Sequence, residues 1–352
     1  MDKKFKNKLI GRGSYGCIFK PNIECKNKSK KKKTKRISKI IIDEDTKSID
    51  HEYKINKMIS RIPNYKNWTV IWEDKCEPPK YEEIFDTTEI IKCLNEANRS
   101  VHDYNKYSQM LIGKYGGYPF KKYCTNLIKK STFTNHSEFK KVFLKLFKLL
   151  NNLFIGLIEL QKINIVHQDL SVNNILFKKN NLYIIDYGLS CKFNNINFIY
   201  KRSRKQITGS RIYDPYPYEY CYMYATRKER KKEINRIIRK DYRNNHIDYL
   251  FIHKKIFNRN YIHETMINNL NYNSSNRSNI IKKLDVYSLG ILILNILVQI
   301  SLAGNISEKQ LISCFHNIDI QNHLSLLKDM TEYYSDNRID IYTAYERYRS
   351  LI

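Results

Sequence analysis

The sequence predicts a protein of class α+β, in which a small β-rich lobe with one main helix precedes a larger, mainly helical lobe. Up to about residue 115, apolar residues gather in short runs separated by turn-forming residues, a pattern typical of strands. Beyond that point they recur every three or four positions, which is typical of helices. The length of 352 residues also exceeds the roughly 250–300 residues at which a single core stops growing. We therefore expect a bilobal fold, with lobes at 1–115 and 116–352 that together form one domain over 1–352.

The first lobe is expected to open with two strands around a glycine turn and to contain one long helix. Asp45 has a side chain that can accept a hydrogen bond from the first turn of that helix. Gly116 and Gly117 are turn-forming residues and mark the expected junction between the lobes. The expected elements are strands at Leu9–Ile10, Cys17–Lys20 and Arg36–Ile42, a helix to about Arg61, and strands at Trp68–Trp72 and Tyr107–Ile112.

The second lobe is expected to be helical around two short strands. A stripe of Phe, Val and Leu runs from Phe139 to Leu160 at helical spacing. The segment at about 220–284 is basic and has weak apolar periodicity, which predicts an insertion. The other expected elements are strands at Ile175–Phe177 and Leu182–Ile185 and helices at Leu284–Ala303, Glu308–Phe315, Leu324–Tyr334 and Tyr342–Tyr348.

The charge balance is strongly basic, with 63 Lys+Arg against 35 Asp+Glu and a formal net charge of +28. The 42% of hydrophobic residues excludes a basic disordered tail, because such a chain can bury a core. Two explanations of the charge remain open. The basic loops, such as Lys26–Lys39, could bind polyanions non-specifically. Alternatively, abundant Lys, Asn, Ile and Tyr reflect A/T-rich codons.

Hydropathy and cysteine spacing predict an intracellular protein of a reducing compartment. The most apolar stretch, Leu289–Ala303, contains polar residues and is shorter than the roughly 20 residues that span a bilayer, so we expect no membrane insertion. Met1–Phe5 lacks the apolar run of a secretion signal. The eight cysteines lie far apart without a CxxC pair, which predicts neither a disulfide framework nor a zinc site.

The segment Gly11–Ile18 fits the pattern G-x-G-x-x-G-x-V. Missing β-carbons let backbone N–H groups approach phosphate oxygens, which favours a nucleotide-binding turn. A dinucleotide-binding fold would continue directly into a helix, whereas here the strand-like Cys17–Phe19 follows. Taken alone, the motif is also compatible with an ordinary tight turn.

A second motif, His167–Leu176, reads H-Q-D-L-S-V-N-N-I-L, and Asp186-Tyr187-Gly188 follows 12 residues after Asn174. Transfer of a phosphoryl group needs a carboxylate that accepts the proton of the nucleophile and oxygen ligands for Mg²⁺. Asp169 is the expected base, and Asn174 and Asp186 are the expected metal ligands. Polar side chains among apolar strands are otherwise expensive to bury, which argues against a purely structural role.

In this order the motifs make the sequence resemble the eukaryotic-type protein kinase family over nearly the whole chain. Pro217-Tyr218-Glu219 looks like a relaxed A-P-E motif, and Asp285–Gly290 looks like the start of the family's central helix. Arg338 looks like the partner of the A-P-E glutamate. The composition is most similar to that of kinases from large DNA viruses, which implies a viral protein in the host cytoplasm.

The resemblance implies ATP and Mg²⁺ as cofactors and protein substrates with serine or threonine hydroxyls. It implies that Lys39 binds the α- and β-phosphates and pairs with Glu52; Lys20 and Glu44 are the alternatives within the sequence. Ile18, Ile37 and Leu176 would enclose the adenine. The implied nucleotide contacts from the glycine segment are Ile10, Gly11, Arg12, Gly13, Ser14, Tyr15, Gly16, Cys17 and Ile18.

Several positions depart from the family pattern. Gln168 replaces an arginine that binds an activation-segment phosphate in many relatives, which predicts activity independent of phosphorylation. Ser171 replaces a phosphate-contacting lysine, which leaves the substrate class and the speed of the chemistry open. Thr208-Gly209-Ser210 resembles the segment that contacts the catalytic aspartate in serine/threonine kinases. Cys191, like Cys17, is either a redox-sensing thiol or an inert buried one.

Two further functions are compatible with the sequence. A phosphotransferase of the same fold that acts on a small molecule also lacks the catalytic-loop lysine, although Glu219, Asp285 and Arg338 argue against it. A non-catalytic basic scaffold that binds polyanions is the other alternative. The basic insertion is a candidate docking segment for acidic protein substrates.

Overall fold

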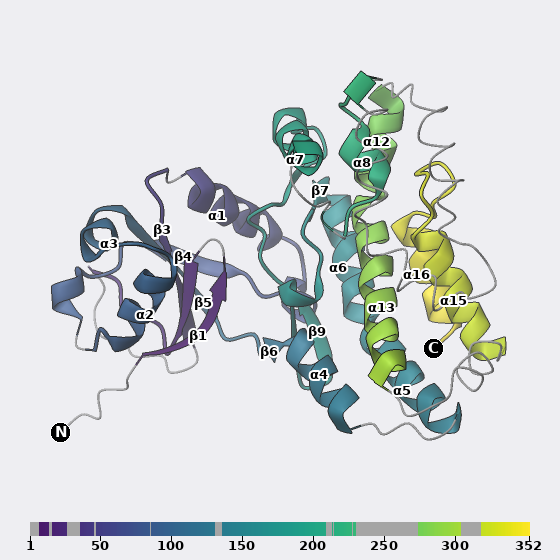
Figure 1. Cartoon of the computed structure of the whole chain (residues 1–352), viewed down its shortest axis with the longest axis horizontal. Helices are drawn as coiled ribbons and strands as arrows, with labels where there is room; N and C mark the ends of the chain where they lie inside the picture. The colour runs from purple at the N-terminus through teal and green to yellow at the C-terminus, as the bar shows by residue number, and fades with distance from the viewer. Residues whose placement is uncertain are drawn as a thin grey trace. The chain divides into compact units, whose positions relative to one another are not determined.

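The computed structural model describes residues 7–13, 16–26, 36–45, 47–84, 86–130, 136–208, 213, 215–226, 228–229, 274–303 and 318–352 (Figure 1). The chain is mixed α+β and divides into two compact units. Unit 1 comprises Met1–Gly117 and Ile185–Gly188, and unit 2 comprises Tyr118–Ile184 and Leu189–Ile352. Each unit is described by itself below.

Unit 1 contains a five-stranded antiparallel sheet with the strand order β1-β2-β3-β5-β4. The predicted strands around the glycine turn and the predicted third strand are confirmed. Alternation along the sheet places Ile40 on one face and Ile41 on the other. The strands are β1 Lys8–Gly13, β2 Gly16–Lys20, β3 Arg36–Ile42, β4 Trp72–Cys76 and β5 Ser108–Lys114.

Helices cover both faces of this sheet (Figure 1). The predicted helix is confirmed as α1 (Lys47–Ile59), whose Ile49 packs with Ile41 and Leu111. On the opposite face lie two short helices, α2 (Thr88–Glu96) and α3 (Val101–Tyr107), which the prediction of one main helix omitted. They are 9 and 7 residues long, too short to show a clear helical period in the sequence.

The fourth strand begins later than predicted. Of the predicted run Trp68–Trp72 only Trp72 belongs to the strand, because Trp68 and Ile71 are core residues of the connection that follows α1. The strand is β4, a mostly polar segment that pairs with β5. Burial in a connection and burial in a strand both produce apolar runs, so the run alone did not locate the strand.

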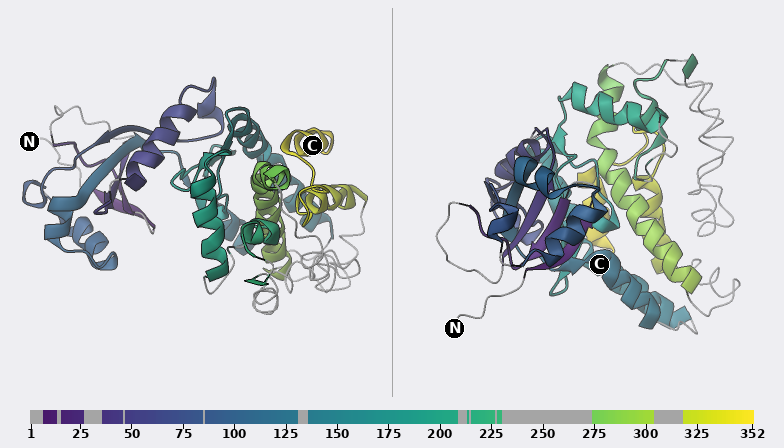
Figure 2. Two further views of the ribbon diagram at one scale, coloured as in Figure 1. Left: turned by 90° about the horizontal axis from the view of Figure 1, so that it is seen from above. Right: turned by 60° about the vertical axis from the view of Figure 1, so that its left-hand side comes forward.

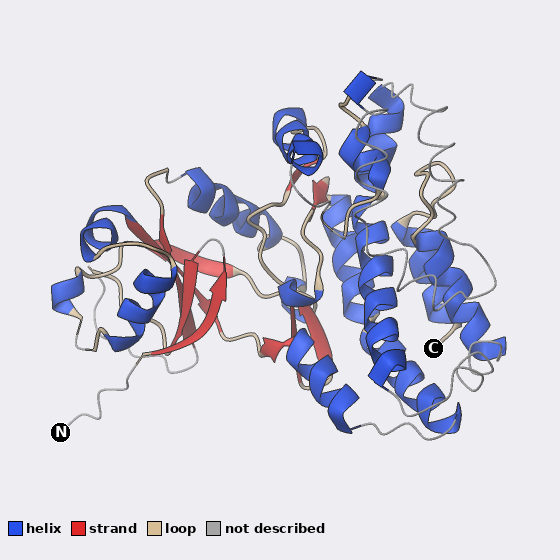
Figure 3. Cartoon of the chain, viewed as in Figure 1, coloured by secondary structure: helices blue, strands red, loops and turns tan. Residues whose placement is uncertain are grey.

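Unit 2 is mainly helical, as predicted (Figure 3). The predicted stripe forms two consecutive helices, α5 and α6. The helices are α4 Phe120–Lys130, α5 His136–Leu149, α6 Asn151–Lys162, α7 Ile196–Thr208, α8 Tyr218–Tyr222, α12 Ser274–Lys282, α13 Leu284–Ala303, α15 Ile318–Met330 and α16 Ile341–Ser350. The strands are β6 Tyr118–Pro119, β7 Ile165–Val166, β8 Ile175–Lys178, β9 Asn181–Ile184 and β10 Cys191–Lys192.

The helix α13 forms the centre of unit 2 and begins and ends where the sequence predicted (Figure 2). Every residue of α13 from Leu284 to Leu294 is buried, which is typical of a central core helix. Gly290 lets α13 approach α15 closely, since a β-carbon there would lie 2.5 Å from Thr331 Cγ2. The predicted helix at 308–315 and most of the predicted insertion at 220–284 lie outside the described residues.

The expectation that the cysteines form no disulfide framework is wrong. Unit 1 contains the disulfides Cys17–Cys93 and Cys25–Cys76, with Cα–Cα distances of 6.1 and 6.0 Å. The partners are 76 and 51 residues apart, so sequence spacing could not pair them, and only the fold brings them together. The prediction of a reducing compartment therefore loses its support from the cysteines. In the described part of the chain, no helix is long and apolar enough to cross a membrane.

Candidate functional site

The glycine motif forms the hairpin of β1 and β2, which we call the glycine hairpin. Gly13 pairs with Gly16, and Ser14 and Tyr15 at its tip lie outside the described residues. Gly16 has a φ of +137°, and a β-carbon there would lie 2.1 Å from the carbonyl oxygen of Ile40. Glycine is thus required at this position for the packing of the hairpin on β3.

Three predicted residues of unit 1 come together beside this hairpin. Lys39 Nζ lies 2.9 Å from Glu52 Oε2 and 3.7 Å from Asp186 Oδ1. The indole nitrogen of Trp72 donates to the other oxygen of Glu52 at 2.8 Å. The Lys39 side chain is only 7% exposed. A lysine and a glutamate are rarely buried unless they are paired, so this arrangement is a built ionic site.

The electrostatics of the site keep Lys39 charged. Burial by itself lowers the pKa of the Lys39 ammonium, because desolvation disfavours the charged form. The charges and hydrogen bonds of Glu52 and Asp186 outweigh that effect and raise the pKa above its usual value. The Lys39 ammonium group is held between two carboxylates. Once a cation neutralises one of these carboxylates, the ammonium group is suited to binding an anionic ligand.

The two alternatives that the sequence left open occupy other places. Lys20 Nζ lies 3.5 Å from the centre of the Tyr115 ring, in a cation–π contact. Glu44 is exposed, whereas Glu52 is buried. Within unit 1, the structure therefore brings together Lys39 and Glu52, and the alternatives Lys20 and Glu44 lie elsewhere.

The Asp186-Tyr187-Gly188 motif is held to unit 1 by a contact that sequence reasoning missed. The Tyr187 hydroxyl lies 2.7 Å from Thr69 Oγ1, and both are buried. A buried tyrosine hydroxyl usually has a hydrogen-bond partner, so the tyrosine of this motif was the signal in the sequence that pointed to such a contact. Asp186 has a φ of +66°, a left-handed conformation that is uncommon outside glycine and often found at functional sites.

In unit 2, the segment His167–Asn174, which we call the HQD loop, contains the predicted base and one predicted metal ligand. The amide nitrogen of Asn174 donates to Asp169 Oδ2 at 2.7 Å and to the Asp169 carbonyl oxygen at 2.8 Å. Asn174 lies in a short 3-10 helix, Val172–Asn174, which turns its side chain back toward Asp169. The amide oxygen of Asn174 remains as its acceptor for a hard cation.

Asp285, the first acidic residue of α13, holds the backbone of the HQD loop. Its two carboxylate oxygens accept from the backbone N–H groups of His167 at 2.6 Å and Gln168 at 3.1 Å. Burial raises the pKa of Asp285 above its usual value, although these N–H groups and the charge of His167 act in the opposite direction. The loop is therefore held by a buried carboxylate that a local sequence pattern does not reveal.

Gln168, which replaces the family's arginine, is completely buried and has a φ of +62°. Its side-chain oxygen accepts from the Tyr220 hydroxyl at 2.6 Å, and its amide nitrogen donates to the Leu189 carbonyl oxygen at 3.0 Å. Its carbonyl oxygen accepts from the Tyr216 hydroxyl at 2.6 Å. Neutral hydrogen bonds thus join the loop to the segment that follows Leu189.

Tyr213 is a site residue that sequence reasoning missed. Its hydroxyl hydrogen-bonds to the Asp169 carboxylate and to the Ser171 hydroxyl. Burial, with the charge of Asp169 next, raises the pKa of this phenol, so it stays protonated. Thr208 ends α7, and Gly209 and Ser210, which were predicted with it to contact Asp169, lie outside the described residues.

The remaining predicted residues of unit 2 form a buried ion pair. Arg338 Nη2 lies 2.7 Å from Glu219 Oε1, and their side chains are 0% and 5% exposed. Burial raises the pKa of Glu219, whereas Arg338 and the Ser335 N–H favour its charged form. The pair joins α8 to the turn before α16.

The residues implied for the adenine lie on strands of different units. Ile18 and Ile37 are on β2 and β3 of unit 1, and Leu176 is on β8 of unit 2. Ile37 is buried and Ile18 is half-buried.

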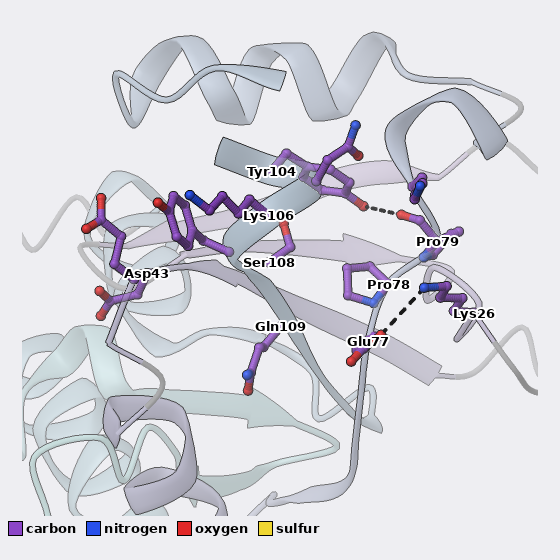
Figure 4. A pocket seen from close by; sticks show the side chains of 13 residues that line it. Lys26, Asp43, Glu77, Pro78, Pro79, Tyr104, Lys106, Ser108 and Gln109 are labelled. Atoms are coloured by element: carbon purple, nitrogen blue, oxygen red, sulfur yellow. Dashed lines mark hydrogen bonds and ion pairs between the residues drawn. The ribbon is translucent and has the colours of Figure 1, made fainter. Parts of the chain in front are cut away.

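A cavity of about 320 Å³ in unit 1 lies away from these motifs (Figure 4). It is lined by the ends of β3 and β5 and by the segment after β4, where Lys26 pairs with Glu77 and Tyr104 donates to the Pro79 carbonyl oxygen. Of the residues that the sequence offered for the site, it is lined by Glu44, the alternative to Glu52, and not by Lys39, Glu52 or Asp186. Its lining carries both signs of charge and contains no arrangement of groups for phosphoryl transfer.

The predicted metal ligands are an amide oxygen and a carboxylate, the donor types that Mg²⁺ prefers. Within the described residues, no three His, Cys, Asp or Glu side chains are grouped to hold a metal ion. Asp186 lies in unit 1 and Asn174 in unit 2, so each unit contains one of the two predicted ligands.

No family model matches the chain, and no curated protein matches it.

Proposed function

We propose that the chain is an ATP-dependent protein kinase of the bilobal kinase fold that phosphorylates serine or threonine hydroxyls. The observation that supports this most strongly is the buried group of Lys39, Glu52 and Asp186 beside a glycine hairpin. Charged side chains are expensive to bury, and their combination with a phosphate-binding type of turn has an explanation in nucleotide chemistry.

In this proposal unit 1 binds the nucleotide. Lys39 contacts the α- and β-phosphates, and Glu52 fixes the direction of the lysine side chain through its 2.9 Å contact. Trp72 fixes Glu52 in turn. Asn174 and Asp186 would hold Mg²⁺, which neutralises charge on the β- and γ-phosphates. Ile18, Ile37 and Leu176 contact the adenine.

Unit 2 supplies the proton acceptor. Asp169 accepts the proton of the substrate hydroxyl while the oxygen of that hydroxyl bonds to the γ-phosphorus and ADP leaves. Asn174 and Tyr213 hydrogen-bond to the Asp169 carboxylate and fix its orientation. The Tyr213 contact also occupies the place beside Ser171 where the family's lysine would act.

A protein substrate is favoured over a small molecule by the Glu219–Arg338 pair, which joins α8 to the turn before α16 and matches the A-P-E glutamate and its arginine in the family that the sequence resembles. A non-catalytic scaffold would not require both a paired Lys39 and an Asp169 that is oriented by two neighbours. A polyanion scaffold also has no need for the buried tyrosine bonds to Gln168.

The test is transfer of labelled phosphate from Mg-ATP to a panel of generic proteins, followed by phosphoamino-acid analysis. We expect labelled serine and threonine with the wild type and no transfer with Asp169→Asn. Label on a small-molecule panel alone would support the phosphotransferase instead. No transfer by the wild type to either panel would contradict the proposal, and transfer that persists in Asp169→Asn would identify a contaminating kinase.

A further inference from the structure

The helix α2 contacts the glycine hairpin at three points spaced along one of its faces. Glu89, Cys93 and Glu96 follow one another at intervals of four and three residues, so their side chains share a face of the helix. Glu89 Oε2 accepts from the backbone N–H of Leu9 at 3.1 Å. Cys93 forms the disulfide with Cys17, and Glu96 forms an ion pair with Arg12.

These contacts include both strands of the hairpin. Leu9 and Arg12 lie near the two ends of β1, and Cys17 directly follows Gly16 on β2. The apolar side of α2 is fixed as well, because Ile90 and Leu94 are buried in one cluster with Phe19 and Met110. A helix inserted between β4 and β5 is thus joined to the segment that the proposed function assigns to the phosphates.

The three contacts differ in strength. The Arg12–Glu96 pair has both side chains 48% exposed, and such pairs contribute roughly 0–1 kcal/mol in water. The Glu89 contact satisfies one N–H group of the edge strand β1. The disulfide is covalent, and it is the contact whose loss would free the hairpin most.

We propose that α2 positions the glycine hairpin for the nucleotide, with Cys93, Glu96 and Glu89 as positioning residues, and that the Cys17–Cys93 bond makes nucleotide affinity depend on the thiol–disulfide state. This inference rests on the proposed function. A hairpin held in one conformation loses less conformational entropy when it closes on a ligand. The oxidised chain therefore binds Mg-ATP more tightly than the reduced chain.

The redox step needs a dithiol reductant such as dithiothreitol. One thiolate of the reductant attacks a sulfur of the Cys17–Cys93 bond and forms a mixed disulfide, which the second thiolate then resolves. The two cysteines gain two electrons and two protons as thiols, and the reductant becomes a cyclic disulfide. Reoxidation by a disulfide such as oxidised glutathione reverses the exchange.

The second disulfide offers a matched control. Cys25–Cys76 also lies in unit 1 and closes a long segment, but it joins the loop after β2 to the end of β4 and contacts neither tip strand near the glycines. Cys76→Ser removes that bond and leaves the contacts of α2 intact. Cys93→Ser removes the bond to the hairpin, and Glu96→Gln removes only the exposed ion pair.

The experiment measures the dissociation constant of a fluorescent ATP analogue with Mg²⁺ for the full chain, before and after treatment with dithiothreitol. Peptide mapping with differential alkylation verifies which bonds are present in each sample. We expect reduction to weaken binding by roughly three- to tenfold. Cys93→Ser should bind as weakly as the reduced wild type in both states, whereas Cys76→Ser should retain the full response to reductant. Glu96→Gln should weaken binding less than twofold, about the effect of an exposed ion pair.

Equal affinity in both states, with the Cys17–Cys93 bond mapped as formed and then broken, would overturn the inference while leaving the proposed function intact. Tighter binding after reduction would overturn it as well. No nucleotide binding in either state would instead contradict the proposed function. If Cys93→Ser does not fold, the comparison of oxidised and reduced wild type with Cys76→Ser decides the question by itself.

Discussion

The glycine hairpin of unit 1 and the HQD loop of unit 2 are held in place by different kinds of bond. The hairpin is fixed by a disulfide, an exposed ion pair and one backbone hydrogen bond, all to α2. The HQD loop is fixed by buried hydrogen bonds from Asp285, Tyr216 and Tyr220. The described free cysteines, Cys124, Cys191 and Cys221, are buried in unit 2.

Because different kinds of bond hold them, the glycine hairpin and the HQD loop should respond to different conditions. A disulfide responds to reductants, whereas buried hydrogen bonds respond to substitutions that leave a donor or an acceptor without a partner. We therefore expect the two candidate half-sites to be disturbed independently. A treatment or substitution that acts on one half-site should leave the other half-site unchanged.

Reduction should destabilise unit 1 and leave unit 2 unchanged. The disulfides close segments of 76 and 51 residues, and the chain-entropy model gives about 4 kcal/mol for loops of this size. Hydrogen exchange followed by mass spectrometry, with and without dithiothreitol, reports the opening free energy of each unit separately. Faster exchange in both units, or in neither, would contradict the comparison.

Asp285→Asn should destabilise unit 2 and the HQD loop. The amide offers one oxygen where the carboxylate offers two, so it places an NH₂ group against the backbone N–H of His167 or Gln168. We expect a loss of about 2–3 kcal/mol, since a charge-assisted bond is lost while the burial of a charge is relieved.

Asp329→Asn is the matched control, because Asp329 pairs with Arg347 in a partly exposed position. It should cost about 0–1 kcal/mol. The same hydrogen-exchange measurement compares the two variants. An Asp285→Asn chain as stable as the control would show that the carboxylate does not hold the loop.

The buried thiols of unit 2 should be inert near neutral pH. Burial raises the pKa of Cys124 to about 12 and that of Cys191 to about 12, so the reactive thiolate is scarce. Iodoacetamide should therefore modify them in the unfolded chain and leave them intact in the folded one. Their contribution to stability is complete below the ordinary thiol pKa of 9.0 and is lost as the pH rises toward about 12, because the unfolded chain ionises first.

Peptide mapping of the folded chain across a pH series checks this prediction. Rapid labelling of Cys191 at neutral pH would instead favour the redox-sensing interpretation of that residue. It would also remove the contrast between the cysteines of the two units.

The smallest expected effect is none. Gln168 is held by the hydroxyls of Tyr216 and Tyr220. The order of the HQD loop therefore does not depend on an ion pair between an activation-segment phosphate and a cationic side chain at position 168. Phosphatase treatment of the active protein should leave its transfer rate unchanged. A loss of most of the rate would show that a phosphate elsewhere in the chain orders the loop.

Local patterns were sufficient for several elements. The isoleucine-rich run in Arg36–Ile42 located β3, and the apolar length of Leu284–Ala303 located α13. Lys39 could be chosen because it lies within an apolar strand after the glycine motif. The family resemblance then implied Glu52 as its partner, and the two meet across 13 residues. These signals arise from burial of neighbouring residues in sequence, which a single chain reveals directly.

The missed features depend on contacts between distant segments. Cys17 and Cys93 meet only because α2 packs on the hairpin, and α2 itself is too short to have a visible period. Tyr213 contacts Asp169, which lies far from it in the sequence, and no local pattern pairs the two residues. Trp68 shows the opposite error, because it is buried in a connection and the apolar run around it was predicted as a strand.

The central claim is that unit 1 binds the nucleotide and unit 2 activates the acceptor, and one paired measurement tests it most directly. The affinity for Mg-ATP and the rate of phosphate transfer are measured for Lys39→Met and Asp169→Asn, with Lys20→Met as the control. Lys39→Met should lose roughly ten- to a hundredfold in affinity, the value of a buried charge-assisted contact. Asp169→Asn should bind Mg-ATP nearly as the wild type does and lose at least roughly a hundredfold in rate. An Asp169→Asn chain that transfers phosphate at the wild-type rate, or a Lys39→Met chain that binds Mg-ATP no worse than Lys20→Met, would contradict the account.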